Sequence, residues 1–192
     1  MKSDSHLYIE DRAMAMGSEI GGLFFDLIYS YPEFLRWSGS HHPDAHHYGE
    51  GGLIKHTAEV IKLCFVTKQA IGSSVDDNIL FLGALFHDTG KLFDYVLADN
   101  TFTRWVPAPH KRLVHHISRS GLIWHDCVSK HPDVYSRYHD EVLHVILSHH
   151  GQRDFGSPVA PRSKEAWLVH FCDGISARMD DADRLDQLKV KA

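Results

Sequence analysis

The sequence predicts an all-α fold, a bundle of about six to eight helices. Apolar residues recur every three or four positions through most of the chain, which is typical of helices with one buried face. Segments containing glycine and proline separate these stretches. No stretch alternates between apolar and polar residues in the way that would indicate a strand buried on one face.

Composition narrows the class of protein. The length of 192 residues favours a single domain, and a hydrophobic content of 43% is enough for a core. The sequence has no apolar run of about 18 residues and no signal peptide at its polar N-terminus, so we expect a cytoplasmic protein. The three cysteines lack CxxC spacing, which argues against a disulfide framework and a thiolate zinc site. A net charge of −5 argues against general coating of nucleic acid.

The expected helices follow one another with loops between them. Pro32 interrupts the first helical stretch, and Gly72 ends the second. Residues 38–52 form a loop rich in glycine and histidine, and residues 92–109 fit either a loop or a short hairpin. In chain order, the predicted helices are residues 19–37, 53–71, 74–90, 111–128, 132–150 and 163–180.

The helix ends carry residues typical of caps. Ser74, with Asp77 three positions later, is expected to begin one helix, and Ser163 is expected to begin the last. Pro132 suits the first turn of the helix between them. The tail from Asp180 mixes acidic and basic residues, so we expect it to be solvated.

Histidine is the compositional outlier, with 17 residues, and it is the commonest metal ligand in proteins. Taken singly, a histidine or aspartate on an apolar helix face could be an ordinary buried side chain with its own hydrogen-bond partner. Several unrelated buried polar groups would each need a separate partner, whereas one bimetal centre satisfies them all. Five predicted helices place such side chains on their apolar faces: His56, His87 with Asp88, His116, His149 and Asp173.

Helical spacing selects His116 rather than its neighbour His115. Leu113 and Ile117 share the face of His116, whereas His115 aligns with Arg112 on the polar side. We therefore expect His116 to point inward and His115 to point away from the core.

Three segments then resemble the HD-domain phosphohydrolase superfamily: HHYGEGGLIKHTAEV at 46–60, GALFHDTGK at 83–91 and LSHHGQRDFGSPVAPRSKEAWLVHFCDGISARMD at 147–180. The sequence is most similar to the HD domain of YhaM-type 3′-to-5′ exoribonucleases, over about residues 34–179. A weaker resemblance to MOBH-type relaxases rests on the HH…GGL…H opening. The chain has no room for the N-terminal OB-fold of the exoribonucleases, and residues 92–114 look longer and less regular. Fold and metal chemistry are therefore expected to transfer, but substrate is not.

The resemblance implies the architecture and the metal ligands. It predicts one HD domain over 1–192, with a helical extension at 1–37, the core at 38–180 and a charged tail at 181–192. His56, His87, Asp88 and Asp173 would hold one ion, and Asp88 would bridge to a second ion held by His116 and His149. We expect two divalent ions, with Mn preferred and Fe, Co, Ni and Zn as alternatives.

The resemblance also implies roles in catalysis and substrate binding. Asp88 is the catalytic carboxylate, and Lys91 is expected to reach a phosphate oxygen. The alternative for Lys91 is a solvated position at a helix C-terminus. His47, His150 and Arg153 are further candidates for substrate binding.

The expected function is metal-dependent hydrolysis of phosphoester bonds in nucleotides or nucleic-acid 3′ ends, as in a phosphodiesterase or exonuclease. A small-nucleotide phosphatase or nucleotidase is an alternative, favoured by the acidic charge and the missing OB-fold. A di-iron oxygenase and a non-catalytic nucleotide-binding module are alternatives from other classes. The expected partner is a nucleotide or short nucleic-acid substrate and not a membrane, and the oligomeric state stays open.

Overall fold

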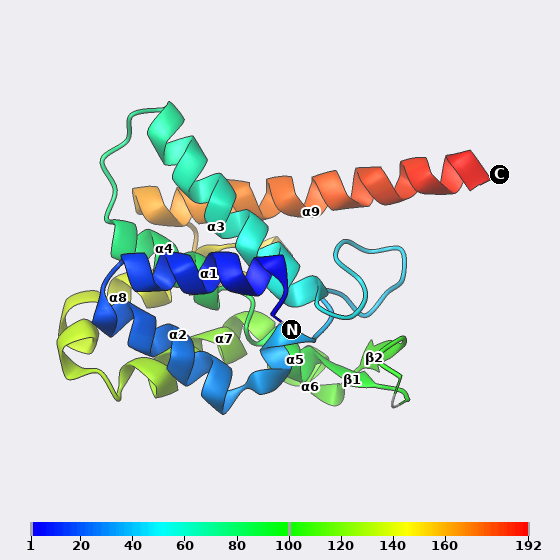
Figure 1. Cartoon of the computed structure of the whole chain (residues 1–192), viewed down its shortest axis with the longest axis horizontal. Helices are drawn as coiled ribbons and strands as arrows, with labels where there is room; N and C mark the ends of the chain where they lie inside the picture. The colour runs from blue at the N-terminus through cyan, green and yellow to red at the C-terminus, as the bar shows by residue number, and fades with distance from the viewer. Residues whose placement is uncertain (1, 100, 192) are drawn as a thin grey trace.

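The computed structural model describes residues 2–99 and 101–191, and it is mostly helical, as predicted (Figure 1). A single two-stranded sheet occurs within the described residues. The elements, in order, are α1 (Asp4–Ala15), α2 (Ser18–Ser30), η1 (Pro32–Leu35), α3 (Gly52–Ala70), α4 (Asp77–Phe86), α5 (Lys91–Asp94), β1 (Tyr95–Leu97), β2 (Trp105–Pro107), α6 (Pro109–Leu113), α7 (His116–Val128), α8 (Pro132–Ser148), η2 (Arg153–Phe155) and α9 (Lys164–Lys191).

Helix α4 is the centre of the bundle. It contacts α3, α7, α8 and α9, and every residue from Leu80 to Phe86 is buried. A helix that is apolar on all sides belongs in the interior, which explains this position. Gly83 allows α8 to approach, because a Cβ atom at this residue would lie 2.5 Å from Cγ1 of Val145. The end of α4 therefore lies deep in the molecule, where the neighbouring helices converge.

Helices α1 and α2 cover one side of this core. Helix α1 packs against α2 and α3 (Figure 1). Ile9 and Ala13 of α1 and Leu23, Phe24 and Leu27 of α2 are all buried. The N-terminal extension predicted at residues 1–37 is therefore packed into the core cluster over its described part.

The start of α4 differs from the prediction by two residues. Asp76, not Ser74, is the N-cap, and its Oδ1 accepts hydrogen bonds from the backbone N–H groups of Asn78 and Ile79. A carboxylate at this position also interacts favourably with the positive end of the helix dipole, which explains why the helix begins after Asp76 and not after Ser74.

The helix predicted over residues 111–128 is broken in two. Helix α6 ends at Leu113, and His115 has a φ of +71° before α7 begins at His116. Leu113 is 76% exposed, so its predicted place on the inner face is wrong. The break lies beside Gly90, where a Cβ would come within 2.1 Å of the His116 carbonyl oxygen. Tertiary contact at this point therefore overrides the helical periodicity.

The segment left open between loop and hairpin forms a hairpin. Strands β1 and β2 pair antiparallel, with Tyr95 opposite Pro107 and Leu97 opposite Trp105. Tyr95 and Trp105 are buried. The hairpin lies at the edge of the bundle beside α5 and α6 (Figure 1).

The expectation of a solvated tail from Asp180 is wrong at its start. Helix α9 continues to Lys191, and Asp180 and Arg184 bond to residues of the 38–52 loop. Ser163 caps this helix as predicted, with its Oγ accepting from the backbone N–H of Ala166. Among the described residues, no helix is both long and apolar enough to cross a membrane.

Candidate metal centre

Four of the predicted ligands meet where α3, the end of α4 and α9 converge. Each offers one ligand atom, and these four atoms lie within 4.8 Å of one another: His56, His87, Asp88 and Asp173. Nε2 of His56 lies 3.1 Å from Oδ1 of Asp173 and 3.4 Å from Oδ2 of Asp88. Nε2 of His87 lies 3.3 Å from the same Oδ2 atom. We call these four residues the first group.

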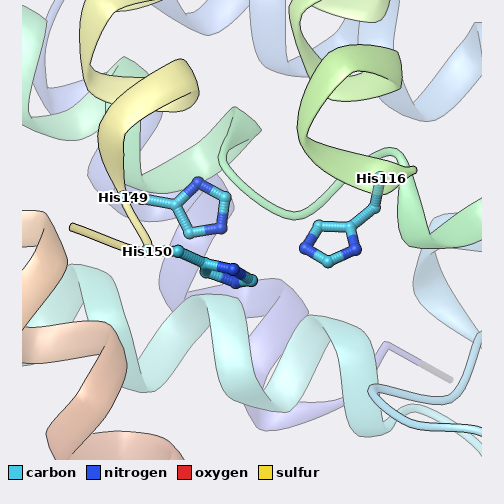
Figure 2. Close-up of side chains that lie close together, drawn as sticks. All are labelled: His116, His149 and His150. Atoms are coloured by element: carbon cyan, nitrogen blue, oxygen red, sulfur yellow. The ribbon is translucent and has the colours of Figure 1, made fainter. Parts of the chain in front are cut away.

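The second oxygen of Asp88 faces the other two predicted ligands. Its Oδ1 lies 3.6 Å from Nε2 of His116 and 3.7 Å from Nε2 of His149. Figure 2 shows the rings of these two histidines with that of His150, which together form another cluster of potential ligand atoms within 4.8 Å. We call Asp88, His116 and His149 the second group. Asp88 is thus common to both groups, one oxygen to each.

A hydrogen bond at Nδ1 orients each of the four histidines. The Nδ1 partners are Ser176 Oγ for His56 (3.0 Å), Ala84 O for His87 (2.8 Å), Asp94 Oδ2 for His116 (3.0 Å) and Ile146 O for His149 (2.7 Å). This arrangement directs every Nε2 atom toward Asp88. Such partners fix the tautomer and the ring orientation of a histidine ligand.

Unpartnered atoms of the second group show that the site suits a cation. Oδ1 of Asp88 and the Nε2 atoms of His116 and His149 are buried without a hydrogen-bond partner. A buried polar atom left unpaired is costly, and three such atoms facing one another need a common partner. Imidazole nitrogen and carboxylate oxygen together suit a divalent transition metal.

The protonation of the second group agrees with this reading. Burial lowers the pKa of His116 to about 4 and holds the pKa of His149 well below its usual value. Both rings are therefore neutral at pH 7, as coordination requires. Burial alone would raise the pKa of Asp88, but Lys91 and His87 hold it well below its usual range, so Asp88 is ionised.

His56 differs in its protonation. Burial lowers its pKa, but hydrogen bonds to Asp173 and Asp88 outweigh burial and raise the pKa to about 9. A proton on His56 therefore competes with a cation in the first group, and binding of a metal there releases it.

Lys91 is buried, not solvated at a helix end. Its Nζ lies 2.6 Å from Oδ2 of Asp88, on the side of the first group. Coulombic attraction to Asp88 outweighs burial and raises its pKa. The alternative of a solvated cap is therefore wrong, and the contact with phosphate stays a prediction.

The structure separates the three further substrate-binding candidates. His150 lies beside the second group, with Nδ1 donating to the Phe155 carbonyl at 2.7 Å. His47 is buried, with Nε2 at 2.8 Å from Glu59 and Nδ1 unpartnered. Arg153 is exposed on η2 and lines a cavity of about 500 Å³ with Arg162. Their contacts with substrate stay predictions.

Two residues near the centre are not marked as site residues by the sequence pattern. Asp94 is fully buried and bonds both His116 and His110, so it orients a ligand of the second group. It lies in the stretch where helical periodicity fades, and only its place after the apolar Leu92 and Phe93 marks it. His115, expected on the polar side, is half-buried with its ring centroid 4.1 Å from that of His116.

A match to a known protein family agrees with this geometry. A family model described as the HD domain matches residues 53–178, well over half of the chain, and this range includes all six predicted ligands. Among solved structures, the HD domain of the L. monocytogenes phosphodiesterase PgpH is similar, with 16% sequence identity and a TM-score of 0.42, covering 88% of this chain and 83% of that chain. The assignment rests on the family match, which agrees with the motifs and the ligand geometry. The chain therefore belongs to the HD domain family, the metal-dependent phosphohydrolase superfamily that its motifs resemble.

Proposed function

We propose that this protein is a phosphodiesterase or exonuclease-like hydrolase that cleaves phosphoester bonds of nucleotides or nucleic-acid 3′ ends. Two divalent ions, Mn by preference, would be held by the first and second groups. The resemblance of its motifs to YhaM-type exoribonucleases favours this class of reaction over that of a phosphatase.

The shared carboxylate of Asp88 carries this proposal. One of its oxygens faces His56 and His87, and the other faces His116 and His149. This is the arrangement expected of a carboxylate that bridges two ions, as in two-metal sites for phosphoryl transfer. When bound, divalent ions supply Lewis acidity toward phosphoryl oxygens and activate water for attack.

The chain itself supplies charge and orientation. The Lys91 ammonium, next to Asp88, would pair with a phosphoryl oxygen and stabilise charge that develops there. Burial of the ligands keeps bulk water away, which strengthens these electrostatic interactions. His150, beside the second group, donates through Nδ1 to the Phe155 carbonyl, so it would contact the substrate as a hydrogen-bond acceptor through Nε2.

A small-nucleotide phosphatase is the second candidate. The enclosure of the centre favours it, because His56, His87, Asp88 and His149 are each 1% exposed or less. A long strand needs an open groove, whereas a single nucleotide can enter a small pocket.

Metal analysis followed by a substrate panel tests the proposal. The metal-loaded protein is assayed with phosphodiester, mononucleotide and oligonucleotide substrates, and Asp88→Ala is measured beside it. We expect turnover that depends on divalent metal, with Asp88→Ala folded but inactive and depleted of metal. Hydrolysis of the mononucleotide alone would select the phosphatase. Bound iron with a mixed-valent spectroscopic signal and no hydrolysis would select the oxygenase, and an active, metal-loaded Asp88→Ala variant would reject the bridging carboxylate.

A further inference from the structure

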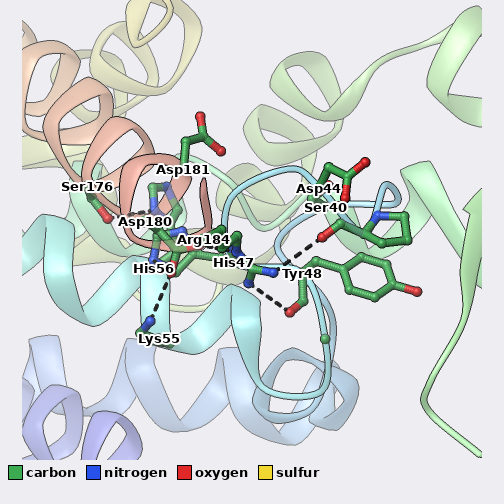
Figure 3. Close-up of polar contacts among 12 residues, drawn as sticks. Ser40, Asp44, His47, Tyr48, Lys55, His56, Ser176, Asp180, Asp181 and Arg184 are labelled. Atoms are coloured by element: carbon green, nitrogen blue, oxygen red, sulfur yellow. Dashed lines mark hydrogen bonds and ion pairs between the residues drawn. The ribbon is translucent and has the colours of Figure 1, made fainter. Parts of the chain in front are cut away.

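The distal part of α9 holds the histidine-rich loop in place. The Arg184 guanidinium donates to the carbonyls of Pro43 (3.3 Å) and Tyr48 (3.1 Å), and its Nε bonds Oδ2 of Asp180 at 2.6 Å. The same Oδ2 accepts from the backbone N–H of His47 at 2.8 Å (Figure 3). We call Asp180 and Arg184 the clamp. It fixes both ends of the short segment 43–48.

Within this segment, His47 serves as the anchor. Its Nε2 bonds Glu59 at 2.8 Å, and Glu59 in turn accepts from Ser176, the Nδ1 partner of His56. His47 is only 2% exposed and has a φ of +53°, a conformation that turns the chain between it and its neighbour. The rings of both His46 and His47 lie next to that of His56, with centroids 5.7 Å and 4.8 Å away, but only His47 is tied to Glu59 through Nε2.

His46 lies on the side of the metal centre. Its ring stacks on that of His56, with centroids 5.7 Å apart and planes inclined by 15°. Burial, together with the positive charge of Lys91, lowers the pKa of His46 to about 4, so its ring is neutral at pH 7. Nε2 of His46 is buried and has no hydrogen-bond partner in the protein. A polar atom in this state calls for a partner that a bound molecule can supply.

We propose that His46 contacts the phosphoester substrate through Nε2, and that Asp180 and Arg184 are positioning residues that hold it over the first group. This inference rests on the proposed function for the identity of the substrate. Residues 46, 180 and 184 lie outside the matched range 53–178, and none of the roles expected from the resemblance falls on them.

Phosphate binding and turnover test the contact separately. Inorganic phosphate is titrated calorimetrically into the Mn-loaded protein, and kcat and KM are measured with the substrate that the wild type hydrolyses best. We expect His46→Ala to weaken phosphate binding and to lower kcat/KM by about tenfold or more, since a hydrogen bond to a charged group is lost. His46→Gln, which keeps a polar atom near the position of Nε2, should recover part of both losses. His42→Ala, in an exposed part of the same loop, is the matched control and should change neither.

The clamp is tested by coupling to His46. Arg184→Ala should raise KM more than it lowers kcat, and Arg184→Lys should recover part of the effect. In the His46→Ala background, Arg184→Ala should add almost nothing, because residues acting through one contact are not additive. Hydrogen exchange of residues 43–48 in the metal-free protein should accelerate in Arg184→Ala. It should not change in Arg178→Ala, an arginine on the same helix that is 83% exposed in its side chain.

Different outcomes distinguish a failure of the proposed function from a failure of the role proposed for His46 and the clamp. A wild type that hydrolyses no phosphoester fails the proposed function, while phosphate binding still reports on His46. Unchanged phosphate affinity and unchanged kcat/KM in both His46 variants, with metal content intact, would overturn the contact. Effects of His46→Ala and Arg184→Ala that simply multiply would overturn the positioning role of the clamp.

Discussion

Within each ligand side chain at the centre, the two polar atoms have different partners. Each ligand histidine bonds an orienting partner through Nδ1 and leaves Nε2 for the centre. Asp88 divides its two oxygens between the two groups. The chemistry of the site therefore depends on which atom of a side chain faces inward, not only on which side chain is buried.

Two neighbouring histidines test this point directly. His116→Ala should lower the metal content of the protein, because its Nε2 faces Asp88 at 3.6 Å. His115→Ala should leave the metal content unchanged, although its ring lies beside that of His116. Elemental analysis of both purified variants decides the question. Loss of metal in His115→Ala with none in His116→Ala would assign the second group to the wrong histidine.

Asp94 orients the ring of His116 but is not one of the predicted metal ligands, so a substitution at Asp94 tests the orientation alone. Asp94→Ala removes the partner of Nδ1 of His116, and loss of such a partner typically lowers metal affinity by about 10–100-fold. At a low free metal concentration, we expect the number of ions bound per protein molecule to fall from two toward one. Competition with a chelator measures the affinity, and Asp99→Ala, an exposed carboxylate on the hairpin, is the control. Equal affinities in the wild type and Asp94→Ala would remove Asp94 from the site.

Whole elements place these residues by close approach. Helix α4 ends at the centre and delivers His87 and Asp88 together, because Gly83 lets α8 pack tightly against it. Gly90 likewise lets the backbone at His116 and the side chain of Ser120 come near, with Ser120 Oγ accepting from the Gly90 N–H at 2.8 Å. Small residues on α4 and after it therefore bring the two groups within reach of one carboxylate.

Two glycines in helices should respond to alanine with opposite signs. Gly83→Ala forces a methyl group against Val145, and overpacking of this kind costs about 1–3 kcal/mol of unfolding free energy. Gly174→Ala in α9 meets nothing within 4 Å, so its better helix propensity should contribute about 0.5–1 kcal/mol. Urea denaturation of both variants measures the difference. A Gly83→Ala variant as stable as Gly174→Ala would show that α4 and α8 can separate at little cost.

At the scale of the whole molecule, the bundle encloses its centre and carries a net charge of −5. Basic side chains near the centre are already engaged: Lys91 pairs with Asp88, Lys55 with Asp180, and Arg184 with the 43–48 segment. Within the described residues, the basic side chains near the centre are therefore sufficient for one or two phosphates rather than for a long strand.

Substrate length should therefore have little effect on affinity. We expect KM to improve over the first few nucleotides and then to level off, because the basic side chains near the centre are already paired and can bind few further phosphates. The dependence of log Kd on log salt should also be shallow, about one to two phosphates at roughly 0.7 each. Oligonucleotides of increasing length at two salt concentrations supply the measurement. Affinity that keeps rising past about ten nucleotides would point to a further binding surface.

The amino-acid sequence by itself determined the all-α class, the order of the long helices and the six candidate ligands. These features depend on local spacing, since three to four residues separate neighbours on one helix face whatever the rest of the chain does. His56, His87, Asp88, His149 and Asp173 could be assigned to inner faces on this ground alone. For His116 the inward position is confirmed but the helix predicted around it is wrong, because the predicted register also placed Leu113 inside.

Only the tertiary structure decided the features that depend on contacts between distant residues. The break before His116 follows from its approach to Gly90, and the attachment of Asp180 and Arg184 to the loop joins segments more than 130 positions apart. The same holds for the choice between His46 and His47, which both lie next to His56 but differ in whether Nε2 has a hydrogen-bond partner. Helical periodicity carries no information about such pairs, because their geometry is set by the packing of whole elements and not by the residues next to them in the chain.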